Sequence, residues 1–148
     1  SWIEAALLFG FSLKLACPKG YAPAGLLLQK IQKEKSPHIQ LTRDPAEACR
    51  NADVINTDTW VSMGQEGKEE AKKREIFQPY QVNEALVKEA KPDVIVLHCL
   101  PAHRGEEITN EVMDGPKSRI WDQSENKLYA QMALLEKSLI GLVKNDKK

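Results

Sequence analysis

Two short stretches of the sequence end in side chains that can do chemistry. Asp58 opens the stretch Asp-Thr-Trp-Val-Ser-Met-Gly, and His98 opens the stretch His-Cys-Leu-Pro. Carboxylate, hydroxyl and thiol groups can bind an ammonium group and hold or pass a proton. Each stretch follows a short apolar run, residues 54–57 or 94–97, of the kind that is typical of a buried strand. If both strands belong to one parallel sheet, both stretches lie at its carboxyl edge, where open α/β sheets bind ligands.

Each of these residues also has a purely structural interpretation. Asp58 could cap a turn, and His98 could be a hydrogen-bonded core histidine. Cys99 could be a small buried hydrophobe, and Leu100-Pro101 could form an ordinary turn. Composition and spacing therefore predict a pocket at this edge but do not name its substrate.

The elements that must position these residues alternate along the chain. We expect helices at 2–9, 23–35, 44–51, 83–90 and 109–113, with a final helix that Ser124 caps. We expect strands at 12–17, 39–42, 54–57, 94–98 and 119–121. Glu47 should complete a capping box with Asp44. The charged segment 65–75 is typical of a solvated helix or loop.

This alternation predicts an α/β fold, a doubly wound, Rossmann-like parallel sheet with helices on both faces. Such sheets usually begin with a strand that becomes central, whereas this sequence begins at a helix. We therefore expect a sheet that lacks its usual first central strand, and an upstream portion that has been cut away.

Composition narrows the class of partner. The chain has 148 residues, 42% of them hydrophobic, which suits one domain over 1–143 with a polar tail at 144–148. Its 21 basic and 21 acidic residues balance, so we expect neither nucleic acid nor a membrane as partner. Cys17, Cys49 and Cys99 show no paired spacing, and the apolar opening is too short to span a bilayer. We expect free thiols and a soluble, cytoplasmic protein.

The two chemical stretches together closely resemble the paired motifs of the ornithine carbamoyltransferase family. Ser124-Glu125-Asn126 also resembles the opening of that family's last helix. The resemblance runs in order over essentially the whole chain and implies the family's second, ornithine-binding domain. It implies transfer of the carbamoyl group of carbamoyl phosphate to the δ-amine of L-ornithine, which gives L-citrulline and phosphate, with no cofactor and no metal.

The resemblance also implies a role for each site residue. Asp58 would accept the α-ammonium of ornithine, and Ser62 and Met63 would bind its head group from a closing loop. Cys99 would lie beside the reacting δ-amine. Leu100 would offer its carbonyl to the carbamoyl group, and the bond to the following proline would be cis, as in the family.

One position departs from the family, since Lys127 stands where the family has arginine after Glu-Asn. Lysine keeps the charge but lacks the planar fork that a bidentate contact with carbamoyl phosphate requires. The family's Ser-Thr-Arg-Thr and His-Pro motifs, which contact carbamoyl phosphate from its first domain, do not occur in this sequence. The resemblance therefore predicts little or no turnover by this chain alone, and a homo-oligomer, since the full-length family is typically trimer-based.

Several alternatives stay open. An alkyl amine is neutral in only about one molecule in several thousand at pH 7. Cys99 could accept its proton or hydrogen-bond to it; alternatively, Asp58 and the thiolate merely orient the amine while bulk buffer takes the proton. The chain could instead be a non-catalytic assembly module that oligomerises by strand or domain exchange, or it could act on another amine. A metal site built from His98, Cys99 and His103 is disfavoured, because adjacent strand residues point to opposite faces.

Overall fold

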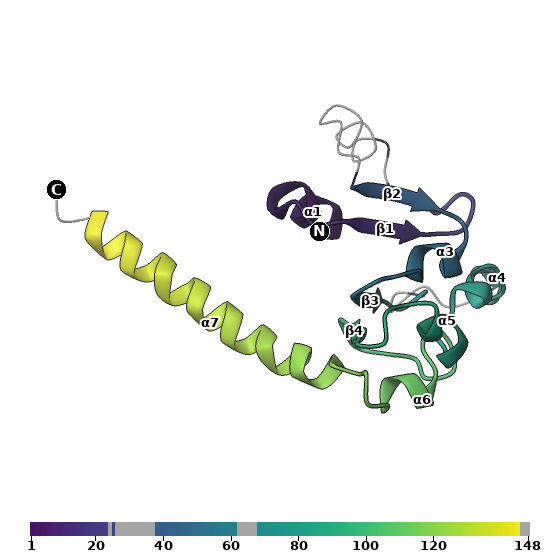
Figure 1. The fold of residues 1–148 in the computed structure, drawn as a ribbon. Helices are drawn as coiled ribbons and strands as arrows, with labels where there is room; N and C mark the ends of the chain where they lie inside the picture. The colour runs from purple at the N-terminus through teal and green to yellow at the C-terminus, as the bar shows by residue number, and fades with distance from the viewer. Residues whose placement is uncertain (24, 26–37, 62–67, 146–148) are drawn as a thin grey trace.

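The structure is a computed structural model that describes residues 1–23, 25, 38–61 and 68–145, with the side chains of 141–145 excepted. Its helices and strands follow the predicted order along most of the chain, but three helical elements stand in succession between β3 and β4, and the described residues 114–119 form no strand (Figure 1). They are α1 (Trp2–Phe9), β1 (Leu13–Ala16), β2 (Ile39–Thr42), α3 (Pro45–Cys49), β3 (Val54–Thr57), α4 (Lys68–Phe77), η1 (Gln78–Tyr80), α5 (Glu84–Lys88), β4 (Ile95–His98), α6 (Asn110–Met113) and α7 (Ile120–Asn145). The helix expected after Pro23 lies almost entirely outside the described residues, as do Ser62 and Met63.

The described strands form two parallel pairs. β1 pairs with β2, with Leu13 beside Ile39, and β3 pairs with β4, with Val54 beside Ile95. In Figure 1 the strands follow one another in the order β2, β1, β3, β4. No ladder joins β1 to β3 within the described ranges. The fold is thus α/β and Rossmann-like, and it lacks a strand in the middle, as the order of elements predicted.

The two faces of β1 are covered by different helices. Leu13 and Leu15 pack against the small cluster that α1 forms with Ile39. The ammonium of Lys14 instead donates to the carbonyl oxygens of Glu47 and Arg50, at 3.4 and 3.0 Å, at the C-terminal end of α3. Because successive side chains of a strand point to opposite faces, α1 and α3 lie on opposite sides of β1. Helices therefore cover both faces there, as expected.

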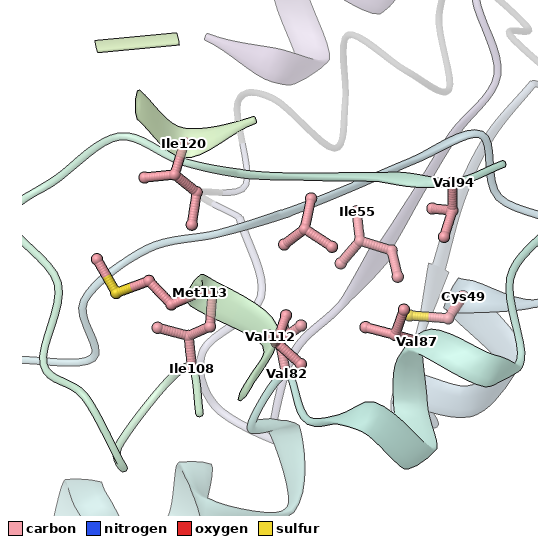
Figure 2. Packing of buried hydrophobic residues seen from close by; sticks show 10 residues of the cluster. Cys49, Ile55, Val82, Val87, Val94, Ile108, Val112, Met113 and Ile120 are labelled. Carbon is pink, nitrogen blue, oxygen red and sulfur yellow. The ribbon is translucent and has the colours of Figure 1, made fainter. Parts of the chain in front are cut away.

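The main core lies around β3 and β4. Val96, Ile108 and Ile120 are fully buried, and burial of an aliphatic side chain of this size stabilises a fold by about 1.5–3 kcal/mol. Figure 2 shows these packed side chains converging from β3, the strand region before β4, the helices α5 and α6, and the start of α7. The cluster consists of Cys49, Ile55, Val82, Val87, Val94, Val96, Ile108, Val112, Met113 and Ile120. This core fixes the ends of β3 and β4, from which the predicted site residues leave.

Two helix starts form as local chemistry predicts. The Asp44 carboxylate accepts a hydrogen bond from the amide of Ala46 at 2.9 Å, and the side chain of Asn83 accepts one from Leu86 at 3.0 Å. The capping box expected of Glu47 is wrong, because its carboxylate accepts the hydroxyl of Thr42 instead. That hydroxyl in turn accepts the amide of Asp44, at 3.1 Å, and so replaces the reciprocal contact.

The start of the last helix differs from the prediction. The strand expected at 119–121 is wrong, because only Ser118 bridges to Val96 and α7 begins at Ile120. Ile120 is fully buried in the core, so its apolar character reflects tertiary packing at a helix start. Ser124 consequently lies inside the helix and does not cap it. The helix also runs to Asn145, past the start of the expected polar tail.

Two helices expose apolar side chains. α1 is buried on one side only: Ala6 is fully buried, whereas Leu8 and Phe9 are 77% and 75% exposed. α7 projects away from the rest of the chain in Figure 1. Its helically spaced apolar residues Leu128, Met132, Leu135 and Leu139 are all exposed, and the side chain of Leu142 lies outside those described. Within the described ranges, none of the helices combines the length and apolar character needed to cross a membrane.

Candidate functional site

The two chemical stretches meet at one edge of the β3/β4 pair. Thr57 lies beside His98 in the parallel register, so the chain leaves both strands at the same end. The thiol of Cys99 donates a hydrogen bond to the Asp58 carboxylate, with an Sγ to Oδ1 distance of 2.8 Å. The predicted convergence of these two strand ends is therefore confirmed.

One carboxylate oxygen of Asp58 makes a structural hydrogen bond, and the other is available to a ligand. Its Oδ1 accepts the amide of Thr59 at 2.8 Å, which is the turn contact that its structural interpretation predicted. Its Oδ2 accepts no hydrogen bond from the part of the chain that the structure describes. The side chain is exposed, while the neighbouring Trp60 is 7% exposed and packs against Phe77. The Asp58 carboxylate is thus held by the backbone amide of Thr59, and its second oxygen can still accept a hydrogen bond from a ligand.

Cys99 carries a protonated thiol at neutral pH. Burial is the largest cause that raises the pKa of Cys99 to about 11, followed by the hydrogen bond to Asp58 and the charge of that carboxylate. The positive charge of Lys127 acts to lower this pKa. In the chain without ligand, Cys99 is therefore a hydrogen-bond donor to Asp58 and not a thiolate.

Lys127 reaches the same edge from α7. Its ammonium donates a hydrogen bond to the carbonyl oxygen of Cys99. A positive charge thus lies beside the strand end although the planar fork of arginine is missing.

Leu100 adopts an uncommon backbone conformation at the end of β4. Its φ is 56°, in the left-handed region, and its bond to Pro101 is cis, as the family resemblance implied. A residue without a glycine's freedom pays on the order of 1–3 kcal/mol in such a region, so neighbouring contacts must hold it. The amide of Leu100 donates to Nδ1 of His98 at 2.9 Å and supplies one such contact.

A buried pair that the sequence did not reveal supports this turn. His98 and Glu107 are both 0% exposed, and Nε2 of His98 lies 3.0 Å from Oε1 of Glu107. Because Nδ1 accepts the amide of Leu100, Nε2 carries the hydrogen and donates it to Glu107. Burial acts to raise the pKa of Glu107, but the hydrogen bonds from His98 and from the amide of His103 outweigh it and lower the pKa overall. The core interpretation of His98 is therefore correct.

No local pattern in the sequence pairs His98 with Glu107. The eight residues between their positions form an irregular loop, and the second carboxylate oxygen of Glu107 is buried without a hydrogen-bond partner among the described residues. Gln123, also missed, accepts the amide of His98 at 2.9 Å. These contacts link β4 to the 101–109 loop and to α7.

The side chains that could bind a metal do not group as His98, Cys99 and His103, the set that the sequence disfavoured. Asp58, His98 and Cys99 place one ligand atom each within 4.8 Å of one another, whereas His103 groups with Glu106 and Glu107. Both ring nitrogens of His98 already have partners, the amide of Leu100 and the carboxylate of Glu107. A metal at the first group would have to break one of these hydrogen bonds.

Comparison with known proteins places this geometry in a family. Residues 1–137 match the family model of the aspartate/ornithine carbamoyltransferase Asp/Orn binding domain. The chain belongs to the aspartate/ornithine carbamoyltransferase family. It is 57% identical over 136 residues to an ornithine carbamoyltransferase of Syntrophus aciditrophicus, a match that covers 92% of this chain and 45% of that protein.

Solved ornithine carbamoyltransferases share the fold. The enzyme from Pyrococcus furiosus superposes with a TM-score of 0.81 at 47% identity, over 91% of this chain and 44% of that chain. The anabolic enzyme from Campylobacter jejuni superposes with a TM-score of 0.82 at 36% identity, over 91% of this chain and 45% of that chain. The chain thus spans about half the length of the relatives that it matches.

Proposed function

We propose that this chain is the ornithine-binding half of an ornithine carbamoyltransferase. The observation that carries the proposal is the 2.8 Å contact between Asp58 and Cys99 at the shared end of two parallel strands, in a chain of this family. In the complete reaction, the δ-amine of L-ornithine attacks the carbonyl carbon of carbamoyl phosphate. L-citrulline forms, and phosphate leaves.

Asp58 selects the amino-acid end of the substrate in this proposal. Its carboxylate accepts a charge-assisted hydrogen bond from the α-ammonium of ornithine. The support is its exposed carboxylate, which is fixed through Thr59 and Cys99 at 2.8 Å each. Ser62 and Met63 complete the grip on the head group by the family resemblance alone, since they lie outside the described residues.

Cys99 hydrogen-bonds to the reacting end of ornithine and does not act as the resting base. With a pKa of about 11, its thiolate is populated at neutral pH in roughly one molecule in ten thousand. This is no larger than the neutral fraction of the free alkyl amine, so a thiolate base gives no advantage. Of the alternatives for the proton, release to solvent is the better supported, with a thiol and not a thiolate beside the amine.

Leu100 and Lys127 serve the carbamoyl side of the reaction in this proposal. The Leu100 carbonyl accepts from the carbamoyl amide group, and the Lys127 ammonium, held on the carbonyl of Cys99, contributes positive charge as the oxyanion forms. Most of the phosphate contacts would come from outside this chain. We therefore expect little or no turnover by the isolated polypeptide, and we propose a cytoplasmic, homo-oligomeric enzyme as its setting.

Titration with L-ornithine tests the binding half of the proposal. Trp60 reports on the site because it follows Asp58 by two residues, and replacing Trp2 and Trp121 by phenylalanine leaves it as the single tryptophan. We expect saturable quenching or enhancement with ornithine and a loss of at least about tenfold in affinity in Asp58→Asn. Asp53→Asn removes the same charge at a distant site and should bind normally. Equal affinity of both variants contradicts the assignment of Asp58.

Two further measurements separate this proposal from its alternatives. Putrescine has no carboxylate on its chain, so calorimetry should show weaker binding of putrescine than of ornithine; equal binding would favour another amine as substrate. Citrulline production at a rate near that of a complete enzyme would refute the predicted inactivity of the isolated chain.

A second candidate function is a non-catalytic assembly module. The apolar residues of α7 that are exposed, Leu128, Met132, Leu135 and Leu139, favour it because a face of this kind is often covered by another protein surface. Static light scattering across a range of concentrations tests this candidate. A monomer at all concentrations, together with ornithine binding, rules it out.

A further inference from the structure

His103, Glu106 and Glu107 form a group of side chains in the loop between β4 and α6. Each of the three offers one ligand atom, and these atoms lie within 4.8 Å of one another. A histidine nitrogen and carboxylate oxygens are ligands that bind zinc and other divalent first-row metals in proteins. We call this group the loop cluster. Its spacing alone does not make a site, because acidic side chains often gather on a protein surface without an ion.

One carboxylate oxygen in the loop cluster is buried and lacks a hydrogen-bond partner. Glu107 is 0% exposed, and its Oε1 accepts hydrogen bonds from Nε2 of His98 at 3.0 Å and from the amide of His103 at 2.6 Å. Its Oε2 is buried as well, but no hydrogen bond within the described ranges reaches it. Buried carboxylate oxygens are normally paired with a donor or bound to a metal. An unpaired one at this depth points to a positively charged ligand.

The unpaired oxygen of Glu107 is directed at the imidazole of His103. Nδ1 of His103 lies 3.9 Å from Oε2 of Glu107, which is too far for a direct hydrogen bond. Zinc binds such nitrogen and oxygen atoms at about 2.0–2.2 Å, so two ligand atoms in a tetrahedron are about 3.4 Å apart. The observed separation exceeds this by about half an ångström, a difference that rotation of the exposed His103 ring can remove. The same exposure, 44% of the side chain, gives an ion a path from solvent.

The loop that carries the cluster is fixed by contacts that do not involve its ligand atoms. The side-chain amide of Gln81 donates to the carbonyl oxygens of Gly105 and Glu106, at 2.8 and 2.7 Å. Gly105 has a φ of 85° and donates its own amide to the carbonyl oxygen of Ile108 at 2.9 Å. Metal sites depend on supporting contacts that hold the ligands in place. The backbone of the loop cluster meets that condition.

Arg74 orients the third side chain of the loop cluster. Its Nε donates to Oε2 of Glu106 at 3.0 Å, and its Nη2 pairs with Glu70 at 2.7 Å. Within the described ranges no hydrogen bond reaches Oε1 of Glu106, so this oxygen is available to an ion. Three carboxylates, those of Glu70, Glu106 and Glu107, thus surround one guanidinium. The negative charge that remains attracts a cation.

We infer that His103, Glu106 and Glu107 bind a divalent first-row metal ion, with zinc as the expected occupant. Nδ1 of His103, an oxygen of Glu106 and Oε2 of Glu107 would be the protein ligands, and water would complete the coordination. Glu107 would keep its Oε1 on Nε2 of His98. The ion would therefore tie the loop to the end of β4 and would take no part in carbamoyl transfer. The inference does not depend on the proposed ornithine site, and it can hold or fail separately.

The other group of candidate ligands is the poorer metal site. Both ring nitrogens of His98 already have partners, and the thiol of Cys99 donates its hydrogen to Asp58. A metal there would have to displace existing hydrogen bonds. In the loop cluster, an ion would instead occupy an oxygen that has no hydrogen bond to lose.

Calorimetric titration of the untagged, full chain with zinc chloride tests the inference. We expect one zinc ion per chain, and a loss of affinity of at least about tenfold in His103→Ala and in Glu106→Gln. Neither side chain is fully buried, and circular dichroism verifies that both variants fold. Glu111→Gln removes the same charge from the exposed surface of α6, and Cys99→Ser removes a ligand of the other group. Both controls should bind zinc within about twofold of the parent affinity.

NMR of the histidine rings locates the ion independently of the variants. Zinc on Nδ1 of His103 leaves the ring hydrogen on Nε2, so proton–nitrogen spectra should show this single tautomer once zinc is bound. The ring of His98, whose Nε2 already carries its hydrogen, should keep its tautomer. A His103 ring that does not respond to zinc overturns the inference.

Three calorimetric results would also overturn it. The first is no zinc binding at millimolar concentration, which would mean that water satisfies Oε2 of Glu107. The second is an unchanged affinity in His103→Ala, which would mean that zinc binds elsewhere on the surface. The third is a loss of binding in Cys99→Ser, which would place the ion at the strand ends beside Asp58.

Discussion

Replacing Asp58 by asparagine should lower the pKa of Cys99. The thiol has a pKa of about 11, raised first by burial and next by the hydrogen bond and charge of Asp58. The substitution keeps the size of the side chain and removes the charge. Burial remains, so the pKa should fall only part of the way toward the usual value of a thiol.

The expected size of the change follows from the geometry. At the observed separation of 2.8 Å, two unit charges in a water-like dielectric interact by about 1.5 kcal/mol. This corresponds to about one pKa unit, and a lower dielectric would give more. At pH 8 the thiolate fraction of Cys99 should therefore rise from roughly one in a thousand to roughly one in a hundred. Alkylation, which requires the thiolate, should accelerate about tenfold.

The assay is the rate of alkylation by iodoacetamide as a function of pH. Cys17→Ser and Cys49→Ala leave Cys99 as the single thiol in both parent and variant. Asp53→Asn, whose carboxylate pairs with Lys91 and not with a thiol, controls for the change in net charge. An alkylation rate in Asp58→Asn within twofold of the parent, or an equal increase in Asp53→Asn, would refute the reasoning about the site.

Three further substitutions test contacts around the site. In the single-thiol background, Lys127→Met should raise the pKa of Cys99 further and slow its alkylation, because Lys127 lowers that pKa. Glu107→Gln should cost about 2 kcal/mol of unfolding free energy in urea at pH 7, whereas Glu106→Gln, on an exposed ion pair, should cost less than about 1. Because the pKa of Glu107 is lowered in the fold, its contribution is present above its unfolded value of 4.5 and is lost as the pH falls; Glu107→Gln should abolish that acid dependence. Gly115→Ala should cost about 1–3 kcal/mol, because its new Cβ would lie 2.4 Å from a backbone oxygen of α6.

The sequence predicted what local chemistry determines. Asp44 and Asn83 cap their helices because a short side-chain oxygen can reach an amide two or three residues ahead. The approach of Asp58 to Cys99 was predictable because two apolar runs of strand length end at these residues, and parallel strands place their ends together.

The contacts that the sequence missed depend on the folded chain. The short apolar run around Ile120 predicts a strand, because such a run does not distinguish a strand from a helix start that packs into the core. The sequence does not indicate a role for Glu107, because its contact with His98 forms only when the intervening loop folds back onto β4. Lys127 reaches the carbonyl of Cys99 across 28 positions of sequence, and only the placement of α7 makes that possible.

The ladder between β3 and β4 holds the site together. One edge of β3 pairs with β4 and holds Asp58 against Cys99, while none of the described strands pairs with its other edge. A strand that is paired on one side only has fewer contacts to resist local opening than one paired on both sides. The position of Asp58 therefore depends, in this chain, on a single ladder and on the core residue Ile55.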